Sequence, residues 1–231
     1  MRKLLYAGIV GPVLFIVVFL AEGFTRAGYS QWRHYVSQLA TGPGGWVQVT
    51  NFVVCGLLVF AFAIGLRKSI KGTRGSVAGP VLLGLFGLDL VAAGIFSTDP
   101  ALGYPVGAAQ VHTMHGMIHG FAGLGAFVFL LPPAAFVMSR HFNAQGERRW
   151  ASYSAGVGAL VIVIFIAMTA TSALDGAGRL PNAPTGFLQR IGIIGGWTWI
   201  AMVAWHQLRV LQAPRRRRHP GIADQPRTAE A

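Results

Sequence analysis

Three histidines lie close together in the stretch VHTMHGMIHG, residues 111–120, at the start of a long apolar run. His115 and His119 have i, i+4 spacing, which brings two side chains to one face of an α-helix and lets two imidazoles bind one metal ion. A helix continued outward to His112 would place all three rings within an arc of about 60°. Because imidazole nitrogen is a common zinc ligand, this stretch predicts a metal site.

A metal-dependent hydrolase is the first functional hypothesis. His34, from the loop sequence WRHYVSQLATGPGGW, would join His115 and His119 around a zinc ion, with His112 as a further ligand. A zinc-bound water would then attack an ester, amide or phosphate of a lipid-like substrate, with Asp99 as general base or fourth ligand. The other predicted site residues are Ser37 for catalysis and Arg33, Arg190, Asp89 and Glu22 for substrate binding.

The acidic residues are predicted to lie at the level of these histidines. Counting along ideal helices from the basic ends of the apolar runs places Glu22 about 28 Å and Asp89 about 22 Å from those ends. Asp99 follows the third run and Asp175 follows the fifth. A charged side chain inside a span is costly unless paired, so Asp89 is expected to pair with Arg190 across the bundle. Structural roles are the alternative, such as an Asp89–Arg190 clamp or interfacial histidines.

Three other functions remain open. In a transporter, Asp89, Glu22 and the histidines would line a vestibule for a proton or cation. Haem binding normally takes axial histidines from two helices at matching depth. His206 lies at the opposite membrane face from the histidines of the fourth span, so the sequence disfavours haem binding. A non-catalytic membrane subunit is the last alternative, since Gly116 and Gly120 have the small-x3-small spacing of close helix contacts.

The elements that must position these residues are membrane helices. The 231-residue chain is 53% hydrophobic and 11% charged, whereas a soluble domain carries about 25% charged residues. The single cysteine, Cys55, lies in an apolar run, which excludes an intramolecular disulfide and a cysteine-based zinc site. The net charge of +12 comes from basic residues that flank the apolar runs, so it predicts membrane orientation and no nucleic-acid partner.

Six apolar segments have about the 20-residue length that crosses a bilayer core. They are residues 4–24, 46–66, 77–97, 115–138, 151–172 and 187–208. We therefore predict an all-α, polytopic bundle of six transmembrane helices within residues 1–211. Of the 19 Lys and Arg residues, 15 flank the spans on one side. The other four are Arg26, Arg33, Arg179 and Arg190. Because basic residues mark the cytoplasmic side, both termini are predicted to be cytoplasmic, in a bacterial inner membrane.

The last residues, 212–231, are rich in Pro and Arg and are predicted to form a basic, disordered cytoplasmic tail. Its arginines would contact anionic lipid or would only set the orientation of the last span. The expected partners are membrane lipids and a small-molecule or lipid substrate, and the oligomeric state stays open.

Three stretches carry a resemblance to a known family. HYVSQLATGPGGWVQVTNFVVCGLLVFAFAIGLRK resembles the first conserved block of the bacterial six-span family catalogued as domain of unknown function 998. GLDLVAAGIFSTDP followed by VHTMHGMIHG is similar to its second block, and GFLQRIG resembles the third, where Gln189 replaces the acidic residue that the family has before Arg190. The resemblance extends from Leu4 to about Leu211. It implies the six-span topology without an activity, and Gln189 weakens any scheme that needs a Glu–Arg pair.

A second likeness is chemical. The membrane hydrolases that include alkaline ceramidases and progestin/adipoQ receptors hold zinc with three histidines, two of them from H-x-x-x-H, near an Asp and a Ser. Here His34, Ser37, Asp99 and the pair His115-x3-His119 are similar residue types. That superfamily has seven spans with H-x-x-x-H in the last one, so this likeness is an analogy of chemistry.

Overall fold

The computed structural model describes residues 1–73 and 75–212, and all regular elements in this part of the chain are helical. Six helical runs are long and apolar enough to cross a membrane. They are α1 (Arg2–Thr25), α2 (Gly45–Ser69), α3 (Gly75–Ile95), the run Met114–Ala144, α6 (Arg148–Gly176) and α7 (Thr185–Gln212). The predicted all-α, six-span fold class is confirmed, and the chain has the architecture of a multi-pass membrane protein.

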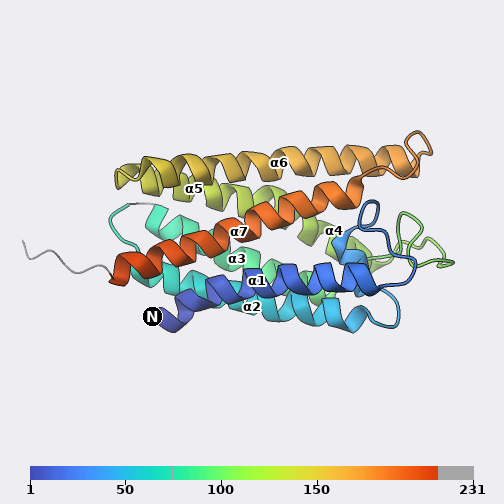
Figure 1. The fold of residues 1–231 in the computed structure, drawn as a ribbon, viewed down its shortest axis with the longest axis horizontal. Helices are drawn as coiled ribbons and strands as arrows, with labels where there is room; N and C mark the ends of the chain where they lie inside the picture. The colour runs from blue at the N-terminus through green and yellow to red at the C-terminus, as the bar shows by residue number, and fades with distance from the viewer. Residues whose placement is uncertain (74, 213–231) are drawn as a thin grey trace, which may run out of the picture.

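The loops divide the bundle into two ends (Figure 1). The longer loops, residues 26–44, 96–113 and 177–184, gather at one end, which we call the outer end. The N-terminus and the last turn of α7 lie at the other, inner end, because an even number of crossings returns the chain to its starting side. Arg74 and the predicted basic tail, apart from Gln212 at the end of α7, lie outside the described residues.

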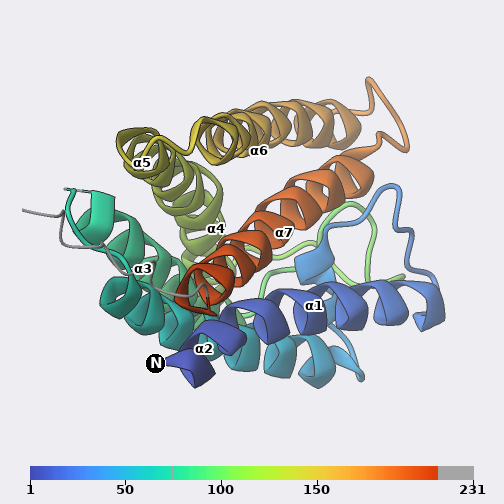
Figure 2. The same ribbon diagram turned by 60° about the vertical axis from the view of Figure 1, so that its left-hand side comes forward.

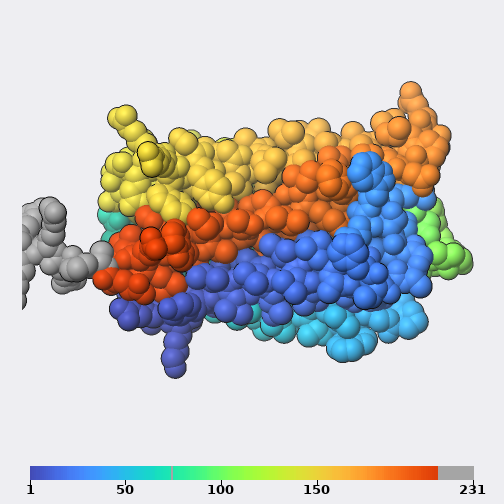
Figure 3. Space-filling view, in the orientation of Figure 1, coloured from blue at the N-terminus to red at the C-terminus, as the bar shows by residue number. Residues whose placement is uncertain are grey.

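Helix α7 holds the two halves of the bundle together. It lies between α1 and α6 (Figure 2), and these three helices form one continuous face (Figure 3). In the core, Trp197 of α7 stacks on Phe15 of α1 with ring centroids 4.2 Å apart. Trp199 is fully buried, and its indole N–H donates to Ser154 on α6 over 2.9 Å. Large aromatic rings therefore fill the centre, with a polar partner for the buried indole.

Glycines set the spacing of α2 and α3. A Cβ atom added at Gly87 would lie 2.6 Å from the carbonyl oxygen of Gly56 and 2.8 Å from the backbone nitrogen of Phe60. No side chain fits there, so the two backbones approach closely, as small residues permit in helix pairs within lipid.

The fourth span is not one regular helix. It consists of α4 (Met114–Leu124), a π-helical turn η2 (Gly125–Leu130) and α5 (Leu131–Ala144). Pro132 and Pro133 lie in the first turn of α5, one residue after the end of η2. Proline has no N–H, and its ring clashes with the carbonyl four residues earlier, so a regular α-helix cannot continue across the pair. The wider turn relieves this clash, and the N–H of Leu131 donates to the carbonyl of Ala126, five residues back.

Candidate functional site

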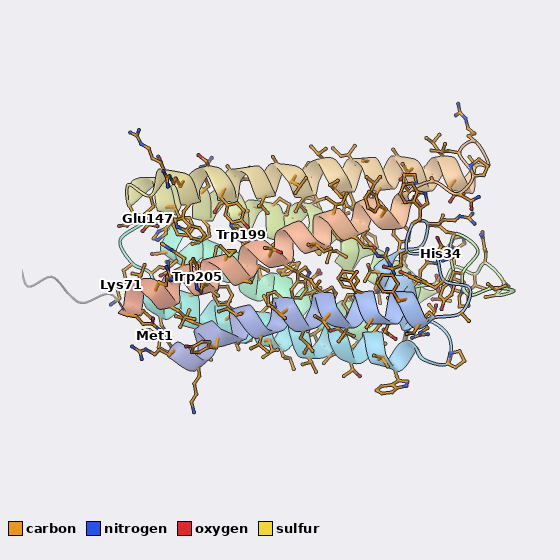
Figure 4. All side chains as sticks on the ribbon, in the orientation of Figure 1. Met1, His34, Lys71, Glu147, Trp199 and Trp205 are labelled. Carbon is orange, nitrogen blue, oxygen red and sulfur yellow. The ribbon has the colours of Figure 1, made fainter. Side chains whose placement is uncertain are left out.

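His34 lies at the outer end of the bundle (Figure 4) and has both ring nitrogens engaged. Its Nδ1 accepts the backbone N–H of Ser30 over 2.9 Å, and its Nε2 lies 3.1 Å from the carbonyl oxygen of Leu102. Because a carbonyl only accepts, Nε2 carries the proton and Nδ1 supplies the lone pair. His34 therefore has no free lone pair for a metal ion, and it ties the first outer loop to the second.

The other histidines are not arranged around a shared ion. Helix α4 begins at Met114, because the Thr113 side chain caps it by accepting the N–H of Gly116, so His112 lies in the loop and off the helical face predicted for it. His115 packs edge-on against Phe96. Over residues 1–73 and 75–212, no group of three or more His, Cys, Asp or Glu side chains is placed to hold a metal ion. The predicted zinc arrangement has no geometric support there.

Asp99 anchors the start of α4. Its two carboxylate oxygens accept the backbone N–H of Thr113 over 2.8 Å and the Thr113 hydroxyl over 2.7 Å. These two bonds hold the pKa of Asp99 below its ordinary value. The carboxylate thus positions the helix cap, and the general-base or ligand role of Asp99 stays a prediction.

Arg190 does not pair with Asp89, contrary to the prediction. Its Nη1 donates to the carbonyl oxygens of Gln31, His34 and Gly186, and its Nη2 donates to the Tyr29 hydroxyl over 2.6 Å. The first outer loop folds down against α7 and offers these acceptors, which spacing along the sequence does not reveal.

The remaining predicted charges are also used in structural contacts. Arg33 forms a two-point ion pair with Asp175, at 2.7 and 3.0 Å, which joins the first outer loop to the end of α6. Glu22 pairs with Arg26 at 2.8 Å, one turn further along the chain. Arg33, predicted to contact a substrate headgroup, and Glu22, predicted to bind substrate, are therefore both held in ion pairs with neighbouring side chains.

A cavity in the outer half of the bundle brings three of the predicted residues together: Asp89, His119 and Ser37. Its volume is about 70 Å³, well above the about 10–15 Å³ that one water molecule needs. Most of the wall is apolar and aromatic, with rings from Phe15, Phe52, Phe86, Phe127 and Trp197. An apolar lining with a few polar groups is the usual lining of a small-molecule site, and the volume here suits only a small ligand.

Asp89 supplies an unpartnered carboxyl group to this cavity. Among the described residues, its buried Oδ2 atom has no hydrogen-bond partner and the carboxylate has no ion pair. A Cβ atom at Gly125 would lie 3.0 Å from Oδ1, so the missing side chain lets the carboxylate approach the first residue of η2. The acid on α3 and the irregular turn of the fourth span therefore meet at one point.

His119 is a second polar group in the wall of the same cavity. Its Nδ1 lies 3.0 Å from the carbonyl oxygen of Ala93 and 2.9 Å from that of Phe96, both near the end of α3. Nδ1 must carry the proton to satisfy these carbonyls, which leaves the lone pair on Nε2. His119 is 8% exposed and its ring meets the edge of Phe52, so the imidazole is held in place.

The roof of the cavity is the short helix η1 (Val36–Ala40), which carries Ser37. Gln189 of α7 holds this roof, since its Oε1 accepts the N–H of Val36 over 2.7 Å. In the sequence, Gln189 stands out only as a glutamine where an acidic residue is expected before Arg190. A glutamine supplies the same hydrogen-bond acceptor as an acidic residue without adding a second buried charge. That chemistry was the signal in the sequence that Gln189 could hold a neighbouring N–H group.

The buried state of His34 predicts a pH dependence of folding. Burial lowers the pKa of His34 below its ordinary 6.5, and the bond to Leu102 offsets only part of this. The unfolded chain therefore binds the proton more readily, so stability is complete above about pH 6.5 and falls as the pH drops below it. We expect the apparent Tm of the purified protein to fall between about pH 7.5 and pH 5.5, and less so in His34→Gln. His112→Gln, at an exposed histidine, is the control, and equal slopes in all three proteins would contradict the prediction.

Comparison with known proteins places the chain in a family. The family model described as "Protein of unknown function (DUF998)" matches residues 9–206, which is most of the chain. No curated protein and no solved structure matches the chain.

Proposed function

Because the chain belongs to the DUF998 family, which by its description supplies no activity, we propose a function from the cavity: the protein binds a small amphipathic molecule there. The ligand has an apolar body, which lies among the aromatic rings, and a cationic, hydrogen-bond-donating group, which lies against Asp89. We also propose that the outer end faces outward from a bacterial inner membrane, as the distribution of basic residues predicts.

The observation that carries this proposal is the unpartnered Asp89 carboxylate in an apolar wall. A charge inside a span is costly unless it is paired, and such residues commonly mark functional sites in membrane proteins. The second polar group of the wall, His119, presents an acceptor as well. A ligand that donates hydrogen bonds and carries positive charge complements both groups, whereas the Asp89 carboxylate would repel an anion.

The test uses the purified protein and two probes of one shape, phenylethylammonium and uncharged 2-phenylethanol. Trp197 lines the cavity, so tryptophan fluorescence can follow binding, with calorimetry as the second readout. We expect Asp89→Asn to weaken phenylethylammonium binding at least about tenfold, since a desolvated charge pair is lost, and to leave 2-phenylethanol nearly unchanged.

A cavity-filling variant makes the location testable. A Cβ atom at Gly123 meets nothing within 4 Å and the residue lines the cavity, so Gly123→Leu should fill the space and remove binding of both probes. Gly120 is equally unhindered and lies one turn earlier on the exposed side of α4, so Gly120→Leu is the matched control. Phenylethylammonium binding that survives both Asp89→Asn and Gly123→Leu would refute the proposal.

Transport is a second candidate, favoured by the broken fourth span beside Asp89. Irregular backbone at membrane depth is characteristic of substrate and ion sites in transporters. In proteoliposomes, uptake of the ammonium probe by the wild type but not by Asp89→Asn would indicate transport. Binding without uptake would indicate a binding protein.

A further inference from the structure

We propose that a groove on the lipid-facing side of α2 and α3, at the inner end, binds an anionic phospholipid. One acyl chain lies in the groove, and the phosphate lies against Arg67 and Lys68. This site is separate from the outer cavity in position, in charge and in ligand, and it does not depend on the function proposed above.

The groove is shaped by small residues between large ones. Its volume is about 350 Å³, and Ala63 of α2 and Gly84 of α3 form its floor, since a Cβ atom at Gly84 would lie 3.6 Å from that of Ala63. Larger apolar side chains that are exposed on the helix surfaces form the walls, namely Phe60, Ile64, Val81, Leu85 and Leu88. An apolar trough along a membrane helix pair suits a hydrocarbon chain and excludes water.

Positive charge lies at one end of the trough. Arg67 and Lys68 belong to the last turn of α2, line the groove and are exposed. Neither forms a salt bridge within residues 1–73 and 75–212, so both cations are available. From Phe60 to Arg67 the helix rises about 10 Å, so a chain in the trough places its headgroup at the membrane surface.

The occupant follows from combining these two features. A free phosphate ion would use the cations but not the apolar trough, and a neutral lipid would use the trough but not the cations. Basic clusters at the cytoplasmic ends of membrane helices attract anionic lipid, and each charge contributes to binding. An anionic phospholipid is the bilayer component that uses both.

The experiment measures lipid retention by native mass spectrometry of the full chain in mild detergent. Phosphatidylglycerol and phosphatidylcholine with identical acyl chains are the probes. We expect the wild type to bind phosphatidylglycerol at least about fivefold more tightly than phosphatidylcholine. Arg67→Gln/Lys68→Gln should lower phosphatidylglycerol binding about tenfold and leave phosphatidylcholine unchanged. Gly84→Leu, which fills the trough, should lower binding of both lipids.

The control removes the same charge elsewhere at the inner end. Arg2→Gln/Lys3→Gln alters two exposed, adjacent cations on α1 and should leave the preference intact. The proposal is overturned if the wild type binds both lipids equally, because the contact is then unselective. It is also overturned if the α1 variant loses as much phosphatidylglycerol as the α2 variant, because the attraction then comes from overall charge.

Discussion

Arg190→Gln is expected to destabilise the protein by about 3 kcal/mol or more, which corresponds to a fall of about 6–12 °C in apparent Tm. Arg190 is 5% exposed and its guanidinium makes four hydrogen bonds, two of them to carbonyls of the first outer loop. Hydrogen bonds to charged groups stabilise more than neutral ones, and losing the donor leaves buried carbonyls without partners. The first outer loop should open, which limited trypsin digestion would detect as faster cleavage after Arg33.

Two variants control this experiment. Arg179→Gln removes the same kind of side chain from an exposed loop position and should change the Tm by no more than about 1 °C. Arg190→Lys keeps the charge but lacks the planar fork, so it should recover only part of the stability. Full recovery by lysine would show that the charge alone matters. An Arg190→Gln protein as stable as the wild type would contradict the prediction that Arg190 holds the first outer loop against α7.

Gly87→Leu should separate α2 from α3 and lower stability by about 3 kcal/mol. The added Cβ would lie 2.6 Å from the carbonyl oxygen of Gly56, and this neighbour is helix backbone that cannot rotate away. The gain in helix propensity over glycine, below about 1 kcal/mol, is too small to offset the clash. Thermal unfolding monitored by circular dichroism in detergent measures the effect.

Gly156→Leu is the matched control for this substitution. Gly156 lies on the exposed face of α6, and a Cβ atom there meets nothing within 4 Å. Its variant should unfold at the wild-type temperature or slightly above it. Equal Tm values for the Gly87 and Gly156 variants would mean that α2 and α3 are not held at the distance described here.

The number of spans was predictable because it depends on local properties. Run length and hydrophobicity decide whether a segment can cross about 30 Å of hydrocarbon, and both are read directly from the chain. The break in the fourth span is also encoded locally, in Pro132-Pro133, inside the segment 115–138 that was predicted as a single span. The concentration of polar candidates at one end followed from counting residues along helices.

Apart from the Glu22–Arg26 pair, which is local, the partners of those polar groups were not predictable, because the contacts join residues distant in the chain. His34 bonds to Leu102, and Arg190 bonds to Gln31, 159 positions away. Such contacts depend on how each helix is rotated about its axis and on how the outer loops fold back onto the bundle. By itself, the sequence determined six membrane helices and an outer layer of ionisable residues. Only the tertiary structure decided that most of these residues tie loops together, while Asp89 and His119 face a common cavity, because spacing along a helix does not specify what lies opposite it.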